Sequence, residues 1–140
     1  MWSNQRIMRI WTSRYGNQEA IIKSNAVPVR IAVGRPRLRY ELAEEIHLFK
    51  PAGALFRMND KEEFRKAPYA KLDQAGIEEV RRILHDISSR HGDRDIVLLC
   101  FEDVRKPGEW CHRQLIAAWL NEHGMNAQEL GEVERQPSLF

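Results

Sequence analysis

Cys111, His112 and Arg113 stand together at the start of a predicted helix, nine residues after Glu102. A thiol, an imidazole and a carboxylate could act as nucleophile and as general acid or base, and a guanidinium could hold an anion. A helix N-terminus and neighbouring cations favour the thiolate of Cys111, which is the nucleophilic form of the side chain. We therefore predict catalytic roles for Glu102, Cys111 and His112, and a ligand-binding role for Arg113.

The same side chains have structural alternatives. Cys111 could pack as a small hydrophobic residue, and Glu102 could orient Arg113 through a two-pronged ion pair instead of moving a proton. His112 could cap its helix or lie exposed. A phosphatase-type Cys-x5-Arg loop is excluded, because Ala117 stands at the arginine position.

No metal or nucleotide fingerprint accompanies these residues. The sequence lacks the Cys-x2-Cys and His-x3-His spacings of common zinc sites, and it has neither Gly-x-Gly-x-x-Gly nor a Walker sequence. We predict no metal ligands, and the sequence names no cofactor.

Two further predicted strands end in loops with phosphate-binding chemistry. Residues 7–13 form the first, which ends at Ser13, Arg14 and Tyr15. Residues 27–33 form the second, and Gly34-Arg35-Pro36-Arg37 follows it. Glycine lets a backbone approach a ligand closely, and arginine offers two parallel donors to a phosphate or carboxylate. We predict that Ser13, Tyr15, Arg35 and Arg37 bind ligand, beside Arg113, if the strands are parallel.

The elements that must position these residues alternate between strand and helix. Ile96 to Phe101 is a short apolar run typical of a strand buried on both faces. The helix from Cys111 to Gly124 follows it, and an amphipathic helix with Ile77, Val80, Leu84 and Ile87 precedes it. The other expected elements are short helices over residues 19–24, 38–46 and 59–66, and short strands over residues 54–56 and 127–133.

This alternation predicts an α/β fold. We expect a single three-layer domain over residues 1–133, with a small, mostly parallel sheet flanked by helices. A tail of residues 134–140 follows it.

Composition restricts the class of partner. The net charge is +2, yet residues 1–40 hold eight arginines and lysines against one acid. A basic segment of this kind favours nucleotide or nucleic acid as partner, although the arginines could simply face solvent. No apolar run reaches the ~20 residues that span a bilayer, so no membrane association is expected. Two cysteines and no signal peptide favour a reduced, cytoplasmic protein, with a reversible Cys100–Cys111 bridge left open.

A resemblance to a known family rests on the residues around the predicted site. Leu98-Leu99-Cys100-Phe101-Glu102, then Cys111-His112-Arg113 followed by Leu115-Ile116-Ala117 and Trp119-Leu120, resembles the signature of the domain-of-unknown-function 488 family. The resemblance implies an α/β fold and a shared polar pocket, but no reaction. The chain departs from the family at the first two strand ends, where it has Thr12-Ser13-Arg14-Tyr15-Gly16 and Gly34-Arg35-Pro36-Arg37.

The last residues form a second motif. Gln136-Pro137-Ser138-Leu139-Phe140 resembles the peptide with which bacterial replication and repair proteins dock on the sliding clamp, usually Gln-Leu-Ser/Asp-Leu-Phe. A glutamine amide and adjacent apolar side chains suit such docking, so we predict that Gln136, Ser138, Leu139 and Phe140 bind a partner. Alternatively, Leu139 and Phe140 fold back onto the domain.

Three functions agree with these features. The first is a small enzyme or nucleotide-binding protein of nucleic-acid metabolism, with a phosphate or nucleotide pocket at the strand ends. The second is a non-enzymatic, DNA-associated adaptor that uses a basic N-terminal face. The third is an α/β scaffold whose polar loop ends are merely hydrated.

Overall fold

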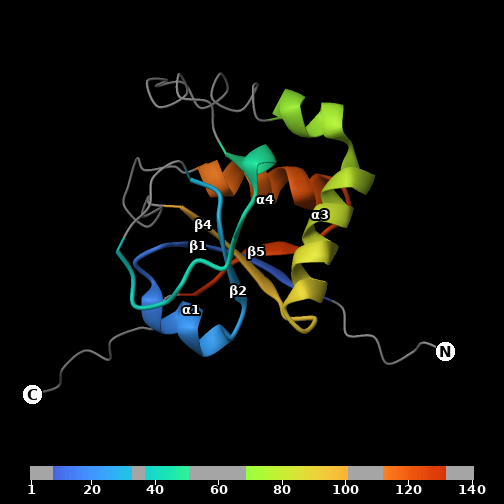
Figure 1. Ribbon diagram of the computed structural model, residues 1–140. Coiled ribbons are helices and arrows are strands. Elements are labelled where there is room, and N and C mark those ends of the chain that lie inside the picture. The colour runs from blue at the N-terminus through green and yellow to red at the C-terminus, as the bar shows by residue number, and fades with distance from the viewer. Residues whose placement is uncertain (1–7, 33–36, 51–68, 101–111, 132–140) are drawn as a thin grey trace, which may run out of the picture.

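The computed structural model describes residues 8–32, 37–50, 69–100 and 112–131. Within these ranges a five-stranded sheet has the order β3-β2-β4-β1-β5, and all of its neighbouring strands are parallel (Figure 1). The strands are β1 (Ile10–Arg14), β2 (Val27–Arg30), β3 (Glu44–Glu45), β4 (Ile96–Cys100) and β5 (Ala127–Glu129). The helices with described bounds are α1 (Gln18–Ser24), α3 (Ile77–Arg90), α4 (His112–Glu122) and the 3-10 helix η1 (His47–Phe49). Residues 69–75 are also helical.

Strand β4 is the centre of the sheet, as its continuous apolar sequence predicts. All five of its residues are buried, because β1 and β2 flank its edges and further elements cover both of its faces. Its register aligns Ile10 with Ile96 on one side and Val27 with Ile96 on the other. The amino ends of the three central strands are therefore level.

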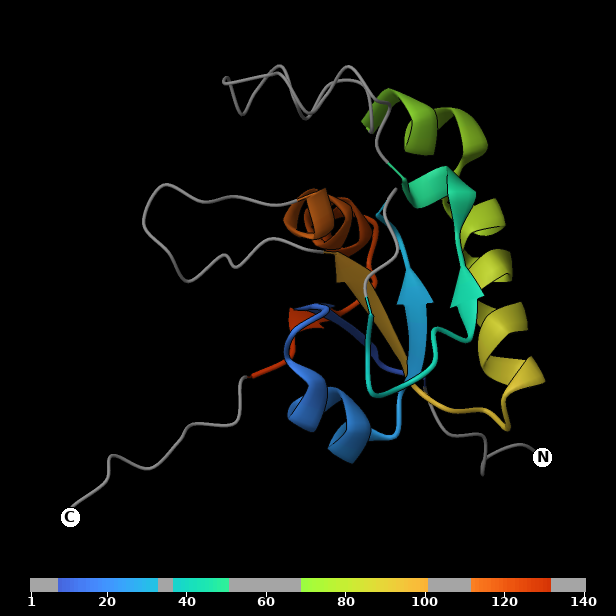
Figure 2. The ribbon, with the colours of Figure 1, turned by 60° about the vertical axis from the view of Figure 1, so that its left-hand side comes forward.

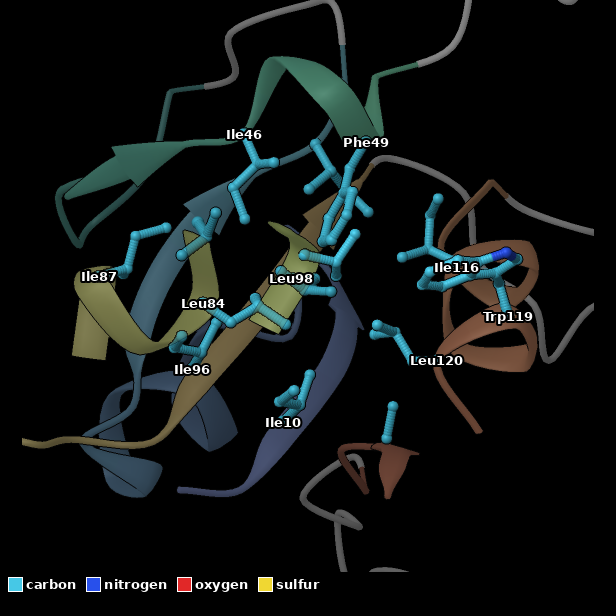
Figure 3. Close-up of a cluster of buried hydrophobic side chains, with 14 of the residues drawn as sticks. Ile10, Ile46, Phe49, Leu84, Ile87, Ile96, Leu98, Ile116, Trp119 and Leu120 are labelled. Carbon is cyan, nitrogen blue, oxygen red and sulfur yellow. The ribbon is translucent and has the colours of Figure 1, made fainter. Parts of the chain in front are cut away.

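The two faces of the sheet are covered by different elements. One face packs Ile10, Val29 and Leu98 against α3 and α4 side chains such as Leu84 and Trp119 (Figure 3). The opposite face packs Val97, Leu99 and partly buried Trp11 against Ile21 of α1 and apolar residues of the segment 38–42. Helix α1 thus lies across the sheet from α3 and α4 (Figure 2), which gives the predicted three layers.

Helix α3 is amphipathic, and a glycine lies just beyond its C-terminal end. Val80, Leu84 and Ile87 are buried, whereas Arg82 pairs with Glu79 and Asp86 on the exposed side. Gly92 follows the helix with φ +74°, a left-handed conformation that glycine adopts at little cost.

The structure confirms the α/β fold, the central strand, α1, α3, α4 and an edge strand at residues 127–129. The prediction of helix over residues 38–46 is wrong. Ala43 N donates to Pro28 O, and Glu44 and Glu45 pair with β2 as strand β3. Pairing with an open sheet edge here overrides the local helical preference of the sequence.

Two other expected elements lie outside the described residues, namely the strand at 54–56 and the helix at 59–66. In the part of the chain that the structure describes, no helix is long and apolar enough to cross a membrane.

Candidate functional site

The sheet topology marks one edge as the place for a ligand. Strands β1 and β4 are neighbours, but the chain continues from β1 into α1 on one face of the sheet and from β4 into α4 on the other. Open α/β sheets bind ligands outside the carboxyl ends of two strands related in this way. We use "carboxyl rim" for the edge of the sheet at which β1 to β5 end.

The end of β1 is a compact group of buried polar residues. Ser13 is 1% exposed, and its Oγ accepts a hydrogen bond from Asn17 Nδ2 at 3.1 Å. The same hydroxyl donates to Arg14 O at 3.2 Å. Tyr15 is buried beside it, and its backbone N–H donates to Cys100 O at 2.8 Å. The structure therefore brings Ser13 and Tyr15 together at the end of β1, next to β4.

The segment of residues 37–40 is fixed to this same place by two hydrogen bonds. Tyr40 Oη donates to Tyr15 O at 2.9 Å, and Arg39 N donates to Gln18 Oε1 at 2.8 Å. Burial, and then the neighbouring Tyr15, raise the pKa of Tyr40, so its hydroxyl stays protonated and keeps donating. Predicted ligand residue Arg37 belongs to this segment and is exposed.

Gly16 allows the Arg14 side chain to pass close to the chain. A Cβ added at Gly16 would lie 2.5 Å from Arg14 Nη1. The Arg14 guanidinium is therefore folded back over the loop that follows β1. It lies on the carboxyl rim between the end of β1 and the start of α1.

Arg113 is buried and fully engaged by protein partners. It is 1% exposed, and its Nη2 and Nε donate to the Glu129 carboxylate at 2.8 and 3.0 Å. Its Nη1 donates to Cys100 Sγ at 3.2 Å. Thr12 Oγ1 donates to Glu129 Oε1 at 2.6 Å. Arg113 thus joins the first turn of α4 to the edge strand β5 and to the end of β4.

Sequence reasoning missed Glu129 and Thr12. Their pairing depends on β5 lying beside β1, in a register that puts Thr12 opposite Glu129. Thr12 and Glu129 are 117 positions apart in the sequence, so no pattern within either strand predicts their contact. The predicted pairing of Arg113 with Glu102 is not described, because Glu102 lies outside the described residues.

His112 is buried rather than exposed, with 4% of its surface accessible. Its Nε2 bonds to the backbone carbonyl of Phe49 at the end of η1. Burial lowers the pKa of His112 to about 4, although the Phe49 carbonyl opposes this by favouring the protonated ring. The ring is therefore neutral at pH 7, with the proton on Nε2, and it fastens the start of α4 to η1.

Cys100, at the end of β4, is disulfide-bonded. This favours the bridged alternative over a pair of reduced thiols. Its sulfur remains able to accept the hydrogen bond from Arg113.

The remaining predicted site residues lie outside the described residues, and their roles stay predictions. They are Arg35, Glu102, Cys111, Gln136, Ser138, Leu139 and Phe140. Among the residues that are described, no three His, Cys, Asp or Glu side chains gather as a metal site would require.

The geometry defines a small parallel α/β domain with a polar carboxyl rim. Comparison with protein-family models, with curated proteins and with solved structures found no match. The resemblance to the domain-of-unknown-function 488 family accordingly stays a prediction, and function must be argued from the rim itself.

Proposed function

We propose that the protein binds a phosphate-bearing ligand, a nucleotide or the backbone of a nucleic acid, at the carboxyl ends of β1 and β4. One observation carries the proposal. Strands β1 and β4 are neighbours, but the connection after β1 lies on one face of the sheet and the connection after β4 lies on the other face. The charges at this place agree with an anionic ligand.

Arg37 and Arg39 supply positive charge that the described protein does not neutralise. Both side chains belong to exposed residues, and neither has an ion-pair partner among the described residues. The bonds from Tyr40 to Tyr15 and from Arg39 to Gln18 hold their backbone beside the end of β1. A guanidinium gives a phosphate two parallel donors, so these arginines suit a phosphate better than a point charge would.

A thermal-shift assay tests the proposal. Purified protein is titrated with nucleoside mono- and triphosphates and with a short single-stranded oligonucleotide. A ligand present at 100 times its Kd should stabilise the fold by about 2.7 kcal/mol. Mononucleotides and the oligonucleotide form separate arms, and the arm with the tighter binding identifies the source of the phosphate.

Matched variants show whether the ligand binds at the carboxyl rim. Arg37→Gln with Arg39→Gln should weaken binding by at least about tenfold, as expected for lost charge-assisted bonds. Arg9→Gln is the control, because Arg9 is also exposed but precedes the amino end of β1. Equal loss of affinity in the double variant and in the control would overturn the proposal.

Catalysis at this rim remains part of the hypothesis. Glu102 would supply an acid–base group, and Cys111 would supply a nucleophilic thiolate only when the disulfide of Cys100, the other cysteine of the chain, is reduced, so turnover is measured in the presence of a reductant. Once a ligand is found, turnover by wild type and by Cys111→Ser should be compared. Undiminished turnover in the variant would remove the thiolate from the mechanism.

A second candidate function rests on the C-terminal sequence. Gln136-Pro137-Ser138-Leu139-Phe140 resembles a sliding-clamp docking peptide, which suits a protein of nucleic-acid metabolism. A clamp pull-down should retain wild type and lose Leu139→Ala with Phe140→Ala, since these apolar side chains would fill the pocket. Glu132→Ala with Glu134→Ala is the control, because both residues shortly precede the motif. Equal retention of full-length chain and a chain truncated after Arg135 would refute docking.

A further inference from the structure

Cys100 ends the central strand β4 as one half of a disulfide. Its sulfur is bonded, and Cys111 is the only other cysteine in the sequence. Within one chain the bond therefore joins Cys100 to Cys111, which lies outside the described residues. Cys100 is 1% exposed. A thiol in solution cannot reach a sulfur buried to this degree, so its attack on the bond must fall on Cys111.

Arg113 holds a donor against the Cys100 sulfur before any reduction takes place. Its Nη1 lies 3.2 Å from Cys100 Sγ, while its Nε and Nη2 donate to the Glu129 carboxylate at 3.0 and 2.8 Å. Thr12 Oγ1 donates to the same carboxylate at 2.6 Å, and the pairing of β5 with β1 fixes its place. The guanidinium therefore needs no rearrangement to meet negative charge on the sulfur.

This contact stabilises the reduced form of the disulfide more than the oxidised form. A disulfide sulfur is neutral and accepts hydrogen bonds weakly, whereas a thiolate forms a charge-assisted bond with a guanidinium. The Glu129 carboxylate opposes a thiolate by repulsion. However, its side chain is 41% exposed and that of Arg113 only 1%, so water screens the carboxylate more than the guanidinium. Because the guanidinium also contacts the sulfur directly, the attraction is the larger effect.

We propose that the Cys100–Cys111 disulfide is a redox-active site that exchanges with small-molecule thiols. Cys100 is the leaving sulfur, and Arg113 stabilises the thiolate that it becomes. The anion that Arg113 holds is thus one that the protein itself generates. The exchange needs no ligand at the carboxyl rim, so it stands or fails independently of the proposed function.

Two displacements complete the reduction. A thiolate attacks Cys111 Sγ and forms a mixed disulfide with it, while the bond to Cys100 breaks and its electron pair leaves on Cys100 Sγ. A second thiolate attacks the sulfur of the bound small molecule, which releases Cys111 as a thiolate and forms the small-molecule disulfide. Two thiols are oxidised and the protein disulfide gains two electrons. The two thiol protons pass to solvent, from which the protein thiolates can take them.

A redox titration with glutathione as the probe tests the proposal. Native protein is equilibrated at a series of ratios of reduced to oxidised glutathione, and its free thiols are then blocked and counted by mass spectrometry. Wild type should pass reversibly from no free thiol to two. Structural disulfides resist the glutathione pool, so a bond that stays closed in a large excess of reduced glutathione would overturn the proposal.

Two variants of the Arg113–Glu129 pair should move this equilibrium in opposite directions. Arg113→Met removes the donor and its charge, and should make reduction about tenfold less favourable, which is about 30 mV for a two-electron couple. Glu129→Gln removes the repulsion and should make reduction about threefold more favourable. A purely structural pair would shift both variants in the same direction, and that result would overturn the role of Arg113. If Arg113→Met does not fold, Glu129→Gln decides alone, and a shift towards the oxidised form or no shift counts against the proposal.

Arg82→Met is the matched control, because Arg82 also pairs with acids but lies exposed on α3. It should leave the equilibrium unchanged. Trapping with oxidised glutathione identifies the leaving sulfur. Native Cys100→Ser should form a mixed disulfide at Cys111, whereas Cys100 should stay free in native Cys111→Ser because it is buried. Mixed disulfides that form equally fast in both variants would overturn the assignment.

Discussion

Glu129 is the residue on which Arg113 depends. The buried guanidinium has its carboxylate partner on an edge strand of three residues, and that carboxylate is 41% exposed. Removing one member of a buried pair weakens the compensation of the other charge, and this costs more than the pair itself contributes. The role of Arg113 as an anion holder stays a prediction, but its described contacts make it a strut between α4 and β5.

Glu129→Ala should therefore lower the free energy of unfolding by about 2 kcal/mol, below the usual range for fully buried pairs because water reaches the carboxylate. Glu129→Gln should cost less, since an amide oxygen can still accept. Urea denaturation measures both. Gln128→Ala, an exposed neighbour on the same strand, is the control. Equal stability of Glu129→Ala and Gln128→Ala would contradict the strut.

His112 should make stability depend on pH. Its pKa is about 4 in the folded protein, against 6.5 for an unperturbed histidine, so between these values the unfolded chain binds the extra proton. Stability is then complete above pH 6.5 and is lost as pH falls towards 4, by roughly 3 kcal/mol in all. Urea denaturation at pH 7 and pH 5 should show a smaller drop for His112→Gln than for wild type. The exposed His85→Gln should keep the wild-type drop, and an unchanged drop in His112→Gln would refute the assignment.

At the scale of the elements, α4 and the helical residues 69–75 are joined by Trp119. Its Nε1 donates to Asp73 Oδ1 at 2.8 Å, and its ring stacks on His123 at a centroid distance of 4.0 Å. Trp119 is 1% exposed, so its indole N–H has been taken out of water and needs this partner.

A double-mutant cycle measures the bond. Asp73→Ala should lower stability by about 1 kcal/mol, because a buried donor loses its acceptor. Trp119→Phe should lower it further through lost packing. The two changes should couple by about 0.5 to 1 kcal/mol. Additive effects would show that the bond contributes nothing.

The elements best predicted from sequence have a strong internal pattern. Leu84 and Ile87 repeat at helical spacing in α3, and β4 is apolar throughout, so local periodicity decides both. Strand β3 has only two residues, both glutamates, and forms because β2 offers an open edge. No local pattern could reveal it. The Glu129–Arg113 and Arg30–Glu45 pairs were missed for the same reason, since both depend on strand order.

At the scale of the molecule, the described basic residues of the N-terminal segment do not form one uniform face. Arg30 is buried against Glu45, and Lys23 pairs with Glu19 on α1. Arg9 precedes the amino end of β1, whereas Arg37 and Arg39 lie by the carboxyl rim. Basic residues that follow one another in the sequence therefore lie at different places on the folded protein.

This division predicts a modest salt dependence for any nucleic-acid binding. With Arg37 and Arg39 as the phosphate contacts, the slope of log K against log salt should be about −1.4 to −1.8, because each contact releases close to one counterion. Fluorescence anisotropy with a labelled single strand, from low to moderate salt, measures the slope. Arg39→Gln should reduce its magnitude by about 0.7 to 0.9, while Arg9→Gln should leave it unchanged. A slope of −6 or steeper, about as expected if all the basic residues made contact, would instead support an adaptor that uses the entire segment.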